Sequence, residues 1–335
     1  MPLEHRRLGR SGIDVSRLGL GGTMLASTEA ERSVSATTIR AAVDAGITYF
    51  DTAPAYGDSE SVLGDLLATE RGSFVVSTKV GGRPTPFDPR DPQLLRRAVE
   101  DSLRRLRRDV IDVLFVHEPD RPGEYDWWVD ASKADGPIAE VIARLQQDGL
   151  VRAAGLGGTT AYGMVELCRS GAFDVLLTAF NYSLLWREAE IALLPAAKEA
   201  GMGVVVGSPF QQGALARRWD AEIAAGPDWM SPPRRAQFRD LYALLDEFEL
   251  PIHEAALRFV LENELVSAVL VGARSPDEVR ANVAVAQLGP LAGPVRRALD
   301  EIAAQVPFRP SEEPMLLPFG RRVKGPGPLV VWAAA

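Results

Sequence analysis

The stretch VRAAGLGGTTAYGMVELCRSGAFDVLLTA, residues 151–179, contains the repeating unit on which the fold assignment depends. It begins with an apolar run over residues 151–156 and ends with another over residues 175–179. Between them, over residues 161–170, apolar residues recur three and four positions apart, as on one face of an amphipathic helix. Neither run alternates with polar residues, which is typical of parallel strands buried on both faces. The stretch therefore predicts a strand, a helix and a second, parallel strand.

The same unit recurs along the chain. Further strands are predicted at residues 17–20, 48–51, 74–79, 111–117, 203–207 and 267–271, and further helices at residues 35–45, 92–106 and 137–148. Eight strands that alternate with helices predict a (β/α)8 TIM barrel. The alternative is an open doubly wound sheet, which needs a glycine-rich turn after its first strand. Residues 19–22 are rich in glycine but lack the third glycine at the required offset, so the count of eight strands favours the barrel.

Three segments fall outside this alternation. Residues 5–15 predict a β-hairpin that precedes the barrel and can close its bottom. Residues 208–251 form a long connection with one helix around residues 235–248, and the proline-rich tail predicts an extended arm. We therefore expect a single barrel domain over residues 1–306, followed by a tail over residues 307–335 that packs on the barrel or extends from it.

The composition excludes several classes of protein. Charged residues make up 24% and hydrophobic residues 46%, as in ordinary globular proteins. The net charge is −8 and the basic clusters are short, so no nucleic-acid partner is expected. One cysteine, Cys168, and three scattered histidines predict neither a disulfide framework nor a metal site. No apolar leader and no uncharged apolar run of about 18 residues is present, so we expect a cytoplasmic protein without membrane contact.

Polar residues stand at the ends of three consecutive predicted strands. These are Asp51, Lys79 and His117, and Tyr56 follows Asp51 in the next loop. Because barrel active sites lie at the C-terminal ends of the strands, all four side chains can meet on one rim. Each residue alone also has a structural interpretation, such as a helix cap, a loop packing residue or a solvent-facing strand end. Together they predict a site in which pKa values are tuned.

These residue types suit proton transfer to or from a carbonyl oxygen. An ammonium such as that of Lys79 lowers the pKa of a nearby phenol such as that of Tyr56, which is ordinarily near ~10. Asp51 would keep the ammonium charged, and His117 can donate a hydrogen bond to a substrate oxygen. No side chain can carry a hydride, so the reduction of a carbonyl or the oxidation of an alcohol at this rim requires a cofactor.

A resemblance to the aldo-keto reductase family is carried by several motifs. They are YFDTAPAYG at residues 49–57, Ser59-Glu60, Leu63-Gly64, STK at residues 77–79 and Val116-His117. The resemblance covers about residues 5–290 and implies a metal-free (β/α)8 barrel that uses NADP or NAD. It also implies that Tyr56 is the proton donor and acceptor, that Lys79 and Asp51 tune it, and that His117 orients the substrate.

The resemblance further implies a cofactor site along the rim. Loops after the first, fifth and sixth strands would border the nicotinamide, the loop after the seventh would cover the pyrophosphate, and the turn after the eighth would hold the adenosine end. The implied residues are Gly22, Thr23, Asp51, Gly158, Thr159, Asn181, Ser208, Pro209, Phe210, Gly213, Leu215, Gly272, Arg274, Ser275, Glu278 and Asn282. Ser275 followed by Pro276 also predicts a plain helix N-cap.

Two positions depart from the family pattern. Many members have Ser-Asn after the fifth strand, where this chain has Gly-Gly-Thr-Thr at residues 157–160. Thr159 can supply one hydroxyl there. A glutamine is often found on the sixth strand near Ala179, and Asn181 can take its place two residues later.

The choice between NADP and NAD depends on charges at the adenosine end. Arg274 beside Ser275 can pair with a 2′-phosphate, which favours NADP. Asp277 and Glu278 oppose that extra negative charge, so NAD stays open. Members of the family are usually monomers, and a monomer is expected here.

The substrate class is inferred from the rim sequence. His117-Glu118-Pro119-Asp120 and GLG at residues 155–157 are similar to the sugar-dehydrogenase branch (aldose, L-fucose and D-threo-aldose 1-dehydrogenases), which oxidises aldoses to lactones. Glu118 can accept hydrogen bonds from sugar hydroxyls or can be a solvated loop acid. Residues 121–135 carry Tyr125, Trp127 and Trp128, whose rings suit sugars or flat aromatic substrates, or form a packing knob. The expected substrate contacts are Tyr56, His117, Glu118, Trp127 and Trp128.

Three functions therefore stay open. The first is an NAD(P)-dependent enzyme that interconverts a hydroxyl and a carbonyl of a sugar or other polyhydroxylated substrate, for example an aldose and its lactone. The second is an NADPH-dependent carbonyl reductase of aromatic or secondary-metabolite aldehydes and ketones. The third is a cofactor-binding subunit without turnover, which the departures after the fifth strand allow and the four rim residues oppose.

Overall fold

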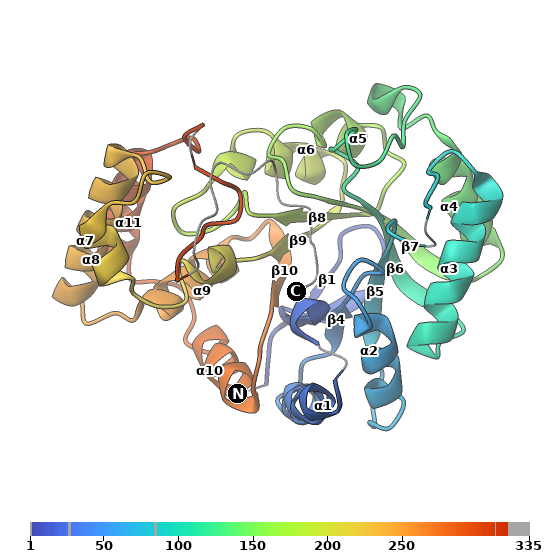
Figure 1. Ribbon diagram of the computed structural model, residues 1–335, viewed down its shortest axis with the longest axis horizontal. Coiled ribbons are helices and arrows are strands. Elements are labelled where there is room, and N and C mark those ends of the chain that lie inside the picture. The colour runs from blue at the N-terminus through green and yellow to red at the C-terminus, as the bar shows by residue number, and fades with distance from the viewer. Residues whose placement is uncertain (1, 26–27, 84–85, 312, 321–335) are drawn as a thin grey trace.

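A closed barrel of eight parallel strands forms the centre of the computed structural model, which describes residues 2–25, 28–83, 86–311 and 313–320 (Figure 1). The strands are β3 (Leu18–Gly21), β4 (Tyr49–Asp51), β5 (Val75–Val80), β6 (Ile111–His117), β7 (Val151–Gly158), β8 (Val175–Ala179), β9 (Gly203–Gly207) and β10 (Val266–Val271). Each strand pairs with the next along the chain, and β10 closes onto β3. The predicted (β/α)8 barrel is confirmed, with each predicted strand at its expected place to within two residues.

Helices follow the barrel strands and cover the outside of the barrel (Figure 1). They are α1 (Glu29–Asp44), α2 (Ser59–Leu67), α3 (Pro92–Leu106), α4 (Pro137–Gln147), α5 (Val165–Arg169), α6 (Leu193–Glu199), α7 (Asp220–Ala225), α8 (Pro232–Glu247), α9 (Ile252–Glu262), α10 (Pro276–Ala286) and α11 (Gly293–Ala304). Helix α3 has the predicted bounds because its start is strongly marked: Asp91 accepts hydrogen bonds from two amides of the first turn, and Pro92 occupies the first helical position. Helix α5 is shorter than predicted and covers only residues 165–169.

The strands separate two hydrophobic cores. Alternate residues point inward and pack together inside the barrel, among them Tyr49, Phe115 and Val205. The other residues, such as Phe50 and Leu114, point outward and pack against the helices. Burial on both faces explains why the strand sequences do not alternate between polar and apolar residues.

A hairpin closes the N-terminal end of the barrel, as predicted. Strands β1 (His5–Arg7) and β2 (Asp14–Ser16) pair in antiparallel fashion. Leu8, Ile13 and Val15 of this hairpin belong to the same buried cluster as the barrel interior. The hairpin therefore fills the bottom of the barrel and leaves the opposite rim for chemistry.

The long connection between β9 and β10 holds more structure than predicted. It contains α7 and α8 as well as α9, and α7 and α8 gather with α11 on one side of the barrel (Figure 1). The start of the predicted tail packs against this group, because Phe319 stacks on Trp219 with ring centres 5.3 Å apart. Residues 321–335 of that tail lie outside the described residues.

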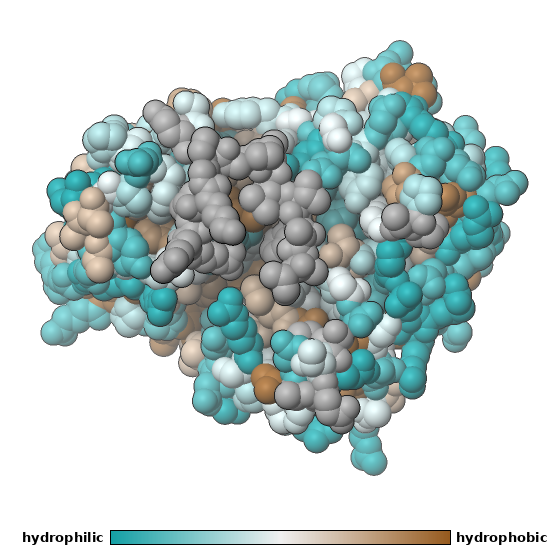
Figure 2. All heavy atoms as spheres, viewed as in Figure 1, coloured by the Kyte–Doolittle hydropathy of each residue, from teal (hydrophilic) through white to brown (hydrophobic). Residues whose placement is uncertain are grey.

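The visible surface is mainly polar. The face in Figure 2 is mostly hydrophilic, and its apolar residues stand in small separate groups. Among the helices of the described part of the chain, none is long and apolar enough to cross a membrane.

Candidate active site

Three inward-facing polar residues end consecutive strands of the barrel. Asp51 is the last residue of β4, Lys79 lies one residue before the end of β5, and His117 is the last residue of β6. Each follows the inward side of its strand, and each keeps less than a tenth of its surface exposed. The structure therefore brings these three predicted residues together at the C-terminal rim. Their catalytic roles stay a prediction.

A buried ion pair holds the lysine in place. Lys79 Nζ lies 2.7 Å from Asp51 Oδ2 and donates a second hydrogen bond to the Thr52 carbonyl oxygen at 2.8 Å. The other oxygen, Asp51 Oδ1, accepts a hydrogen bond from the Ser77 hydroxyl at 2.6 Å. Burial alone would lower the pKa of Lys79, but the Asp51 carboxylate and the Tyr56 phenol raise it above its usual value. The ammonium is therefore kept charged.

The tyrosine lies in the loop that joins β4 to α2. Tyr56 is half-buried, and Lys79 Nζ lies 4.8 Å from the centre of its ring. The ring meets that of His117 edge to face, with centres 6.2 Å apart. Burial raises the pKa of Tyr56 more than Lys79 lowers it, so the net shift is upward, against the lowering that the sequence led us to expect. The phenol therefore carries its proton at neutral pH.

The histidine is an uncharged hydrogen-bonding group. Burial, with a smaller effect of the Lys79 charge, lowers the pKa of His117 to about 3. Its Nδ1 atom is buried with no hydrogen-bond partner among the described residues. In the tautomer that carries its proton on Nε2, the neutral ring can donate a hydrogen bond to a substrate oxygen.

The two tryptophans expected to contact substrate instead donate hydrogen bonds to the backbone at and just after His117. Trp127 is fully buried, and its indole N–H donates to the His117 carbonyl oxygen at 2.9 Å. Trp128 donates to the Pro119 carbonyl oxygen at 2.9 Å and packs its ring against Phe173. Direct contact between Trp127 and a substrate does not fit this burial, so that expectation is corrected. Both rings hold the backbone that carries His117.

Tyr125 is the aromatic residue that sequence reasoning did not select. Its half-buried ring lies nearly parallel to that of His117, with centres 6.5 Å apart, and meets Phe87 edge to face. Its place among residues 121–135, close to Trp127, was the available clue, but the spacing of the three rings did not show which of them lies beside His117. Tyr125 adds a flat aromatic surface next to His117.

A polar cluster lies next to the histidine. The Glu118 carboxylate is 2.6 Å from Arg121 Nε and accepts a hydrogen bond from the Thr159 hydroxyl at 3.1 Å. Arg121 also reaches Met315, whose sulfur accepts from Nη2 at 2.8 Å. Burial raises the pKa of Glu118 although Arg121 opposes the shift. The cluster joins the loops after β6 and β7 to the segment that follows α11.

A profile of the Aldo/keto reductase family matches residues 17–304, which is most of the chain. The chain belongs to the aldo/keto reductase family. As an aldo/keto reductase it is an oxidoreductase that depends on NAD(P), in agreement with the resemblance that the sequence motifs carry.

Several relatives of this aldo/keto reductase have names. Pyridoxal 4-dehydrogenase of Microbacterium luteolum is 32% identical over 84% of this chain and 92% of its own length. D-threo-aldose 1-dehydrogenase of a Pseudomonas species is 31% identical over 75% and 82%. L-galactose dehydrogenase of Arabidopsis thaliana is 30% identical over 90% and 94%. The aldo-keto reductase AKR11C1 from Bacillus halodurans, in its holo form, superposes with a TM-score of 0.73 at 28% identity, covering 93% of this chain and 100% of that chain.

Small residues line the part of the inner rim where the nicotinamide ring of this aldo/keto reductase is predicted to lie. On the five strands other than β4, β5 and β6, or directly after them, the inward residue at the rim has no side chain or only a methyl group. These residues are Gly21, Gly157, Ala179, Gly207 and Gly272. A Cβ atom placed on Gly21 would meet no atom closer than 3.9 Å. The rim thus combines polar groups on three strands with small residues on the other five, and the space beside Gly21 fits a flat ring near Tyr56.

The residues predicted to border the nicotinamide differ in their surroundings. Gly22 and Thr23 form the short 3-10 helix η1 (Gly22–Met24) directly after β3. Gly158 faces outward, because a Cβ atom there would lie 2.5 Å from both Asp120 and Met164. The Thr159 hydroxyl is already engaged by Glu118 and Arg121, and the Asn181 amide group donates to the Ala179 carbonyl oxygen. Thr159 was predicted to replace the Ser-Asn pair of other family members at the nicotinamide, but Glu118 and Arg121 compete with the cofactor for its hydroxyl.

The remaining predicted cofactor residues lie after β9 and β10. Ser208, Pro209 and Phe210 form a tight turn in which the Phe210 carbonyl oxygen accepts hydrogen bonds from the Gly213 and Leu215 amides at 3.0 Å. Leu215 itself is fully buried and serves packing.

At the adenosine end the predicted N-cap is present. The Ser275 hydroxyl accepts from the Glu278 amide at 3.3 Å, and the Glu278 carboxylate accepts from the Arg274 amide at 2.7 Å. The Arg274 side chain is exposed, Gly272 is exposed, and Asn282 is buried. The N-terminus of α10 beside an exposed guanidinium suits a phosphate. The N-cap leaves the predicted phosphate contact possible.

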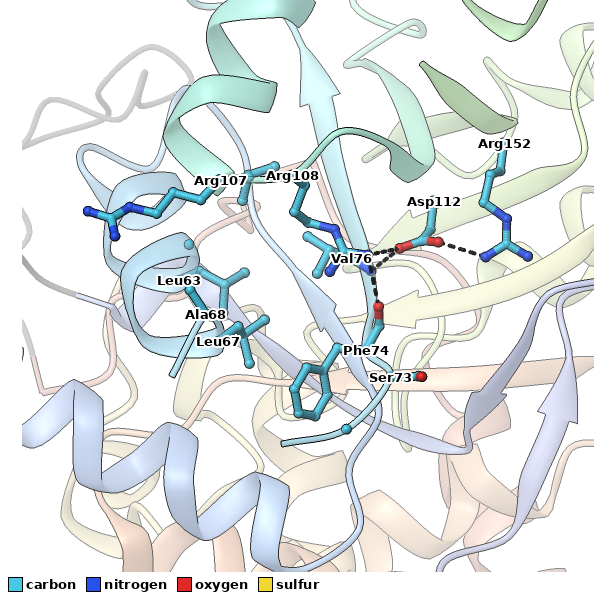
Figure 3. Close-up of a pocket in the computed structure, with 13 residues that line it drawn as sticks. Leu63, Leu67, Ala68, Ser73, Phe74, Val76, Arg107, Arg108, Asp112 and Arg152 are labelled. Atoms are coloured by element: carbon cyan, nitrogen blue, oxygen red, sulfur yellow. Dashed lines mark hydrogen bonds and ion pairs between the residues drawn. The ribbon is translucent and has the colours of Figure 1, made fainter. Parts of the chain in front are cut away.

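A surface cavity of about 360 Å³ lies apart from the rim, between α2, α3 and the starts of β5 and β6 (Figure 3). Phe74 and apolar residues of α2 line one side. On the other side Asp112 accepts hydrogen bonds from the Val76 amide at 2.9 Å, from Arg108 at 3.0 Å and from Arg152 at 2.7 Å. These hydrogen bonds and ion pairs link the N-terminal ends of β5, β6 and β7. None of the predicted site residues lines this cavity.

Proposed function

We propose that this aldo/keto reductase oxidises the anomeric hydroxyl of a free aldose to a lactone. The proposal is carried by Tyr56 beside the charged Lys79 and the neutral His117, with the half-buried Glu118 carboxylate next to them. The first three residues suit proton transfer at a single oxygen. Glu118 adds an acceptor for neighbouring hydroxyls. Two of the relatives are sugar dehydrogenases by name, which supports this substrate class.

The residues divide the reaction between them. His117 donates a hydrogen bond from Nε2 to the anomeric oxygen and orients it. During reduction the protonated phenol of Tyr56 gives its proton to the carbonyl oxygen, and during oxidation the phenolate form of Tyr56 takes the hydroxyl proton. Lys79, held by Asp51, stays charged beside the phenol and stabilises it whenever the proton has left. When bound, the nicotinamide cofactor would accept the hydride that leaves the anomeric carbon.

A second candidate function is the reduction of aromatic carbonyl compounds. The Tyr125 ring lies nearly parallel to His117, and its flat face suits an aromatic ring. The name of one relative, pyridoxal 4-dehydrogenase, also refers to an aromatic aldehyde. The two candidates therefore differ in whether Glu118 or Tyr125 dominates substrate recognition.

Cofactor preference, oligomeric state, localisation and partners are proposed as well. We propose that the exposed Arg274 favours NADP, that the protein acts as a monomer in the cytoplasm, and that it binds no nucleic acid. Titration of NADP and NAD into the wild type and into Arg274→Ala tests the role of Arg274. If the variant keeps the same preference for NADP, Arg274 does not set that preference.

The decisive experiment compares substrates and directions in one assay. Reduction of NAD⁺ and NADP⁺ is followed with a panel of free aldoses, and oxidation of NADPH with aryl aldehydes. Sugar oxidation supports the main proposal, whereas turnover confined to aryl aldehydes supports the second. Tyr56→Phe should lower kcat by at least ~100-fold, because it removes the proton that is exchanged, while cofactor binding is retained. Unchanged turnover in Tyr56→Phe would contradict the mechanism.

A further inference from the structure

Ser59, the first residue of α2, is fully buried and connects two loops of the rim. Its amide donates a hydrogen bond to the Tyr56 carbonyl oxygen at 3.1 Å. Its hydroxyl donates to the Gly22 carbonyl oxygen at 2.7 Å, at the start of η1. One residue therefore holds both the loop that carries the predicted proton donor and the loop that borders the predicted nicotinamide site.

The direction of the neighbouring hydrogen bonds is fixed by their chemistry. A carbonyl oxygen can only accept, so the proton of the Ser59 hydroxyl must point to Gly22. The Thr52 hydroxyl, 2.8 Å from Ser59 Oγ, must then donate to Ser59. The Thr52 carbonyl oxygen in turn accepts from Lys79 Nζ at 2.8 Å. A continuous buried path thus runs from Gly22 through Ser59 and Thr52 to Lys79.

The residues along this path are closely packed. A Cβ atom on Gly22 would lie 2.6 Å from Ser59 Oγ and 2.8 Å from the Asp51 carbonyl oxygen. Glycine is therefore required at residue 22 so that η1 can approach Ser59 closely. Ser59 and Thr52 are both fully buried, so water cannot replace a lost hydroxyl without a change in packing.

We propose that Ser59 is a positioning residue that couples the loop at Gly22 to the Tyr56–Lys79 pair. Cofactor binding and the alignment of the proton donor then depend on each other through Ser59 and Thr52. This inference rests on the proposed function for the role of Tyr56. It adds a residue that touches neither substrate nor reacting atoms.

The test uses the full-length protein and two readouts that need no substrate. Binding of NADPH and NADH is measured by quenching of tryptophan fluorescence, and the ionisation of Tyr56 by ultraviolet difference titration against Tyr56→Phe. Ser59→Ala should weaken cofactor binding by about fivefold or more and raise the pH at which Tyr56 ionises. With any substrate that the wild type turns over, kcat should fall by about tenfold with a smaller change in KM.

Thr52 supplies a second, independent variant. Thr52→Val removes the donated hydroxyl and should reproduce the effects of Ser59→Ala in both readouts. Thr52→Ser keeps the hydroxyl and should restore much of the coupling. The double variant Ser59→Ala with Thr52→Val should lose less than the product of the two single losses, because both break the same path.

Ser16 offers a matched control at the opposite end of the barrel. Its fully buried hydroxyl also makes two hydrogen bonds, donating to the Leu18 carbonyl oxygen at 2.7 Å and accepting from the Thr48 amide at 2.9 Å. Ser16→Ala should lower Tm without a change in cofactor binding or Tyr56 titration. If Ser59→Ala behaves in the same way, the proposal is overturned. If the wild type turns over no substrate, the proposed function fails, yet both binding and titration still decide the role of Ser59.

Discussion

Among single residues, burial sets the protonation state of the rim. The rings of Tyr56 and His117 meet edge to face, and burial favours the neutral form of each, so one is a protonated phenol and the other an uncharged imidazole. Lys79 is the exception, because the Asp51 carboxylate 2.7 Å away keeps it charged. The rim therefore presents one positive charge, at Lys79, and two neutral groups that can donate hydrogen bonds, Tyr56 and His117.

A pH prediction follows for His117. Because its pKa is lowered to about 3, the imidazole is almost entirely neutral above about pH 5. Proton NMR of the three histidines should therefore show one imidazole whose signals do not move between about pH 5 and 8, and that signal should be missing in His117→Asn. His5→Gln and His253→Gln assign the other two signals. A midpoint near ~6.5 for the His117 signal would contradict the burial argument.

Among the elements, the hairpin β1–β2 contributes to the stability of the fold, whereas the strand ends and the loops after them hold the candidate active site. Leu8 is fully buried in the cluster that fills the barrel interior. It enters from the N-terminal end, whereas Tyr56 and Lys79 lie at the C-terminal rim. Stability and chemistry are thus assigned to opposite ends of the same strands.

Leu8→Ala tests this separation. The truncation leaves a cavity in a closed interior and should lower the free energy of unfolding by about 2–5 kcal/mol. At a temperature where the variant is folded, kcat should match that of the wild type. Urea unfolding and initial rates measure the two quantities. Leu288→Ala, at a half-exposed leucine after α10, should change stability by less than about 0.5 kcal/mol. A large drop in kcat for Leu8→Ala would show that the two ends are not independent.

In the whole molecule, a buried ion pair fastens the segment after α11 to the side of the barrel. Glu313 pairs with Arg234 of α8 at 2.7 Å, and both side chains are almost completely buried. Trp186 donates its indole N–H to the same carboxylate at 2.5 Å, and Arg309 lies 3.0 Å from it. Met315, two residues further on, contacts Arg121 of the rim cluster.

Removal of this carboxylate should be costly. Glu313→Ala leaves the Arg234 charge buried without its partner, so we expect a loss of about 3–5 kcal/mol in the free energy of unfolding. Glu313→Gln keeps hydrogen-bonding atoms and should lose less. Glu301→Ala at an exposed position of α11 is the control and should stay within about 0.5 kcal/mol of the wild type. A loss for Glu313→Ala as small as that of the control would mean that the other contacts of the segment, such as those of Met315 and Phe319, hold it without this ion pair.

Much of the architecture could be predicted from local patterns. Strands β6, β8 and β9 and helix α3 have their predicted bounds, because apolar runs, an Asp cap and a proline at the first helical position are local features. Helix α2 was not predicted. It is short and begins with a buried Ser59 and Glu60 whose partners are distant in the sequence, the Gly22 carbonyl oxygen and the Thr78 hydroxyl. Such partners leave no periodic pattern.

The sequence by itself determined the barrel and the identity of the four rim residues, because strand ends and their spacing are read along one chain. Only the tertiary structure decided that Trp127 supports His117 from behind while Tyr125 lies beside it. It also decided that burial outweighs the Lys79 charge in setting the pKa of Tyr56. The reason is physical: orientation and desolvation depend on every element packed around a side chain, and these elements are brought together only when the barrel closes.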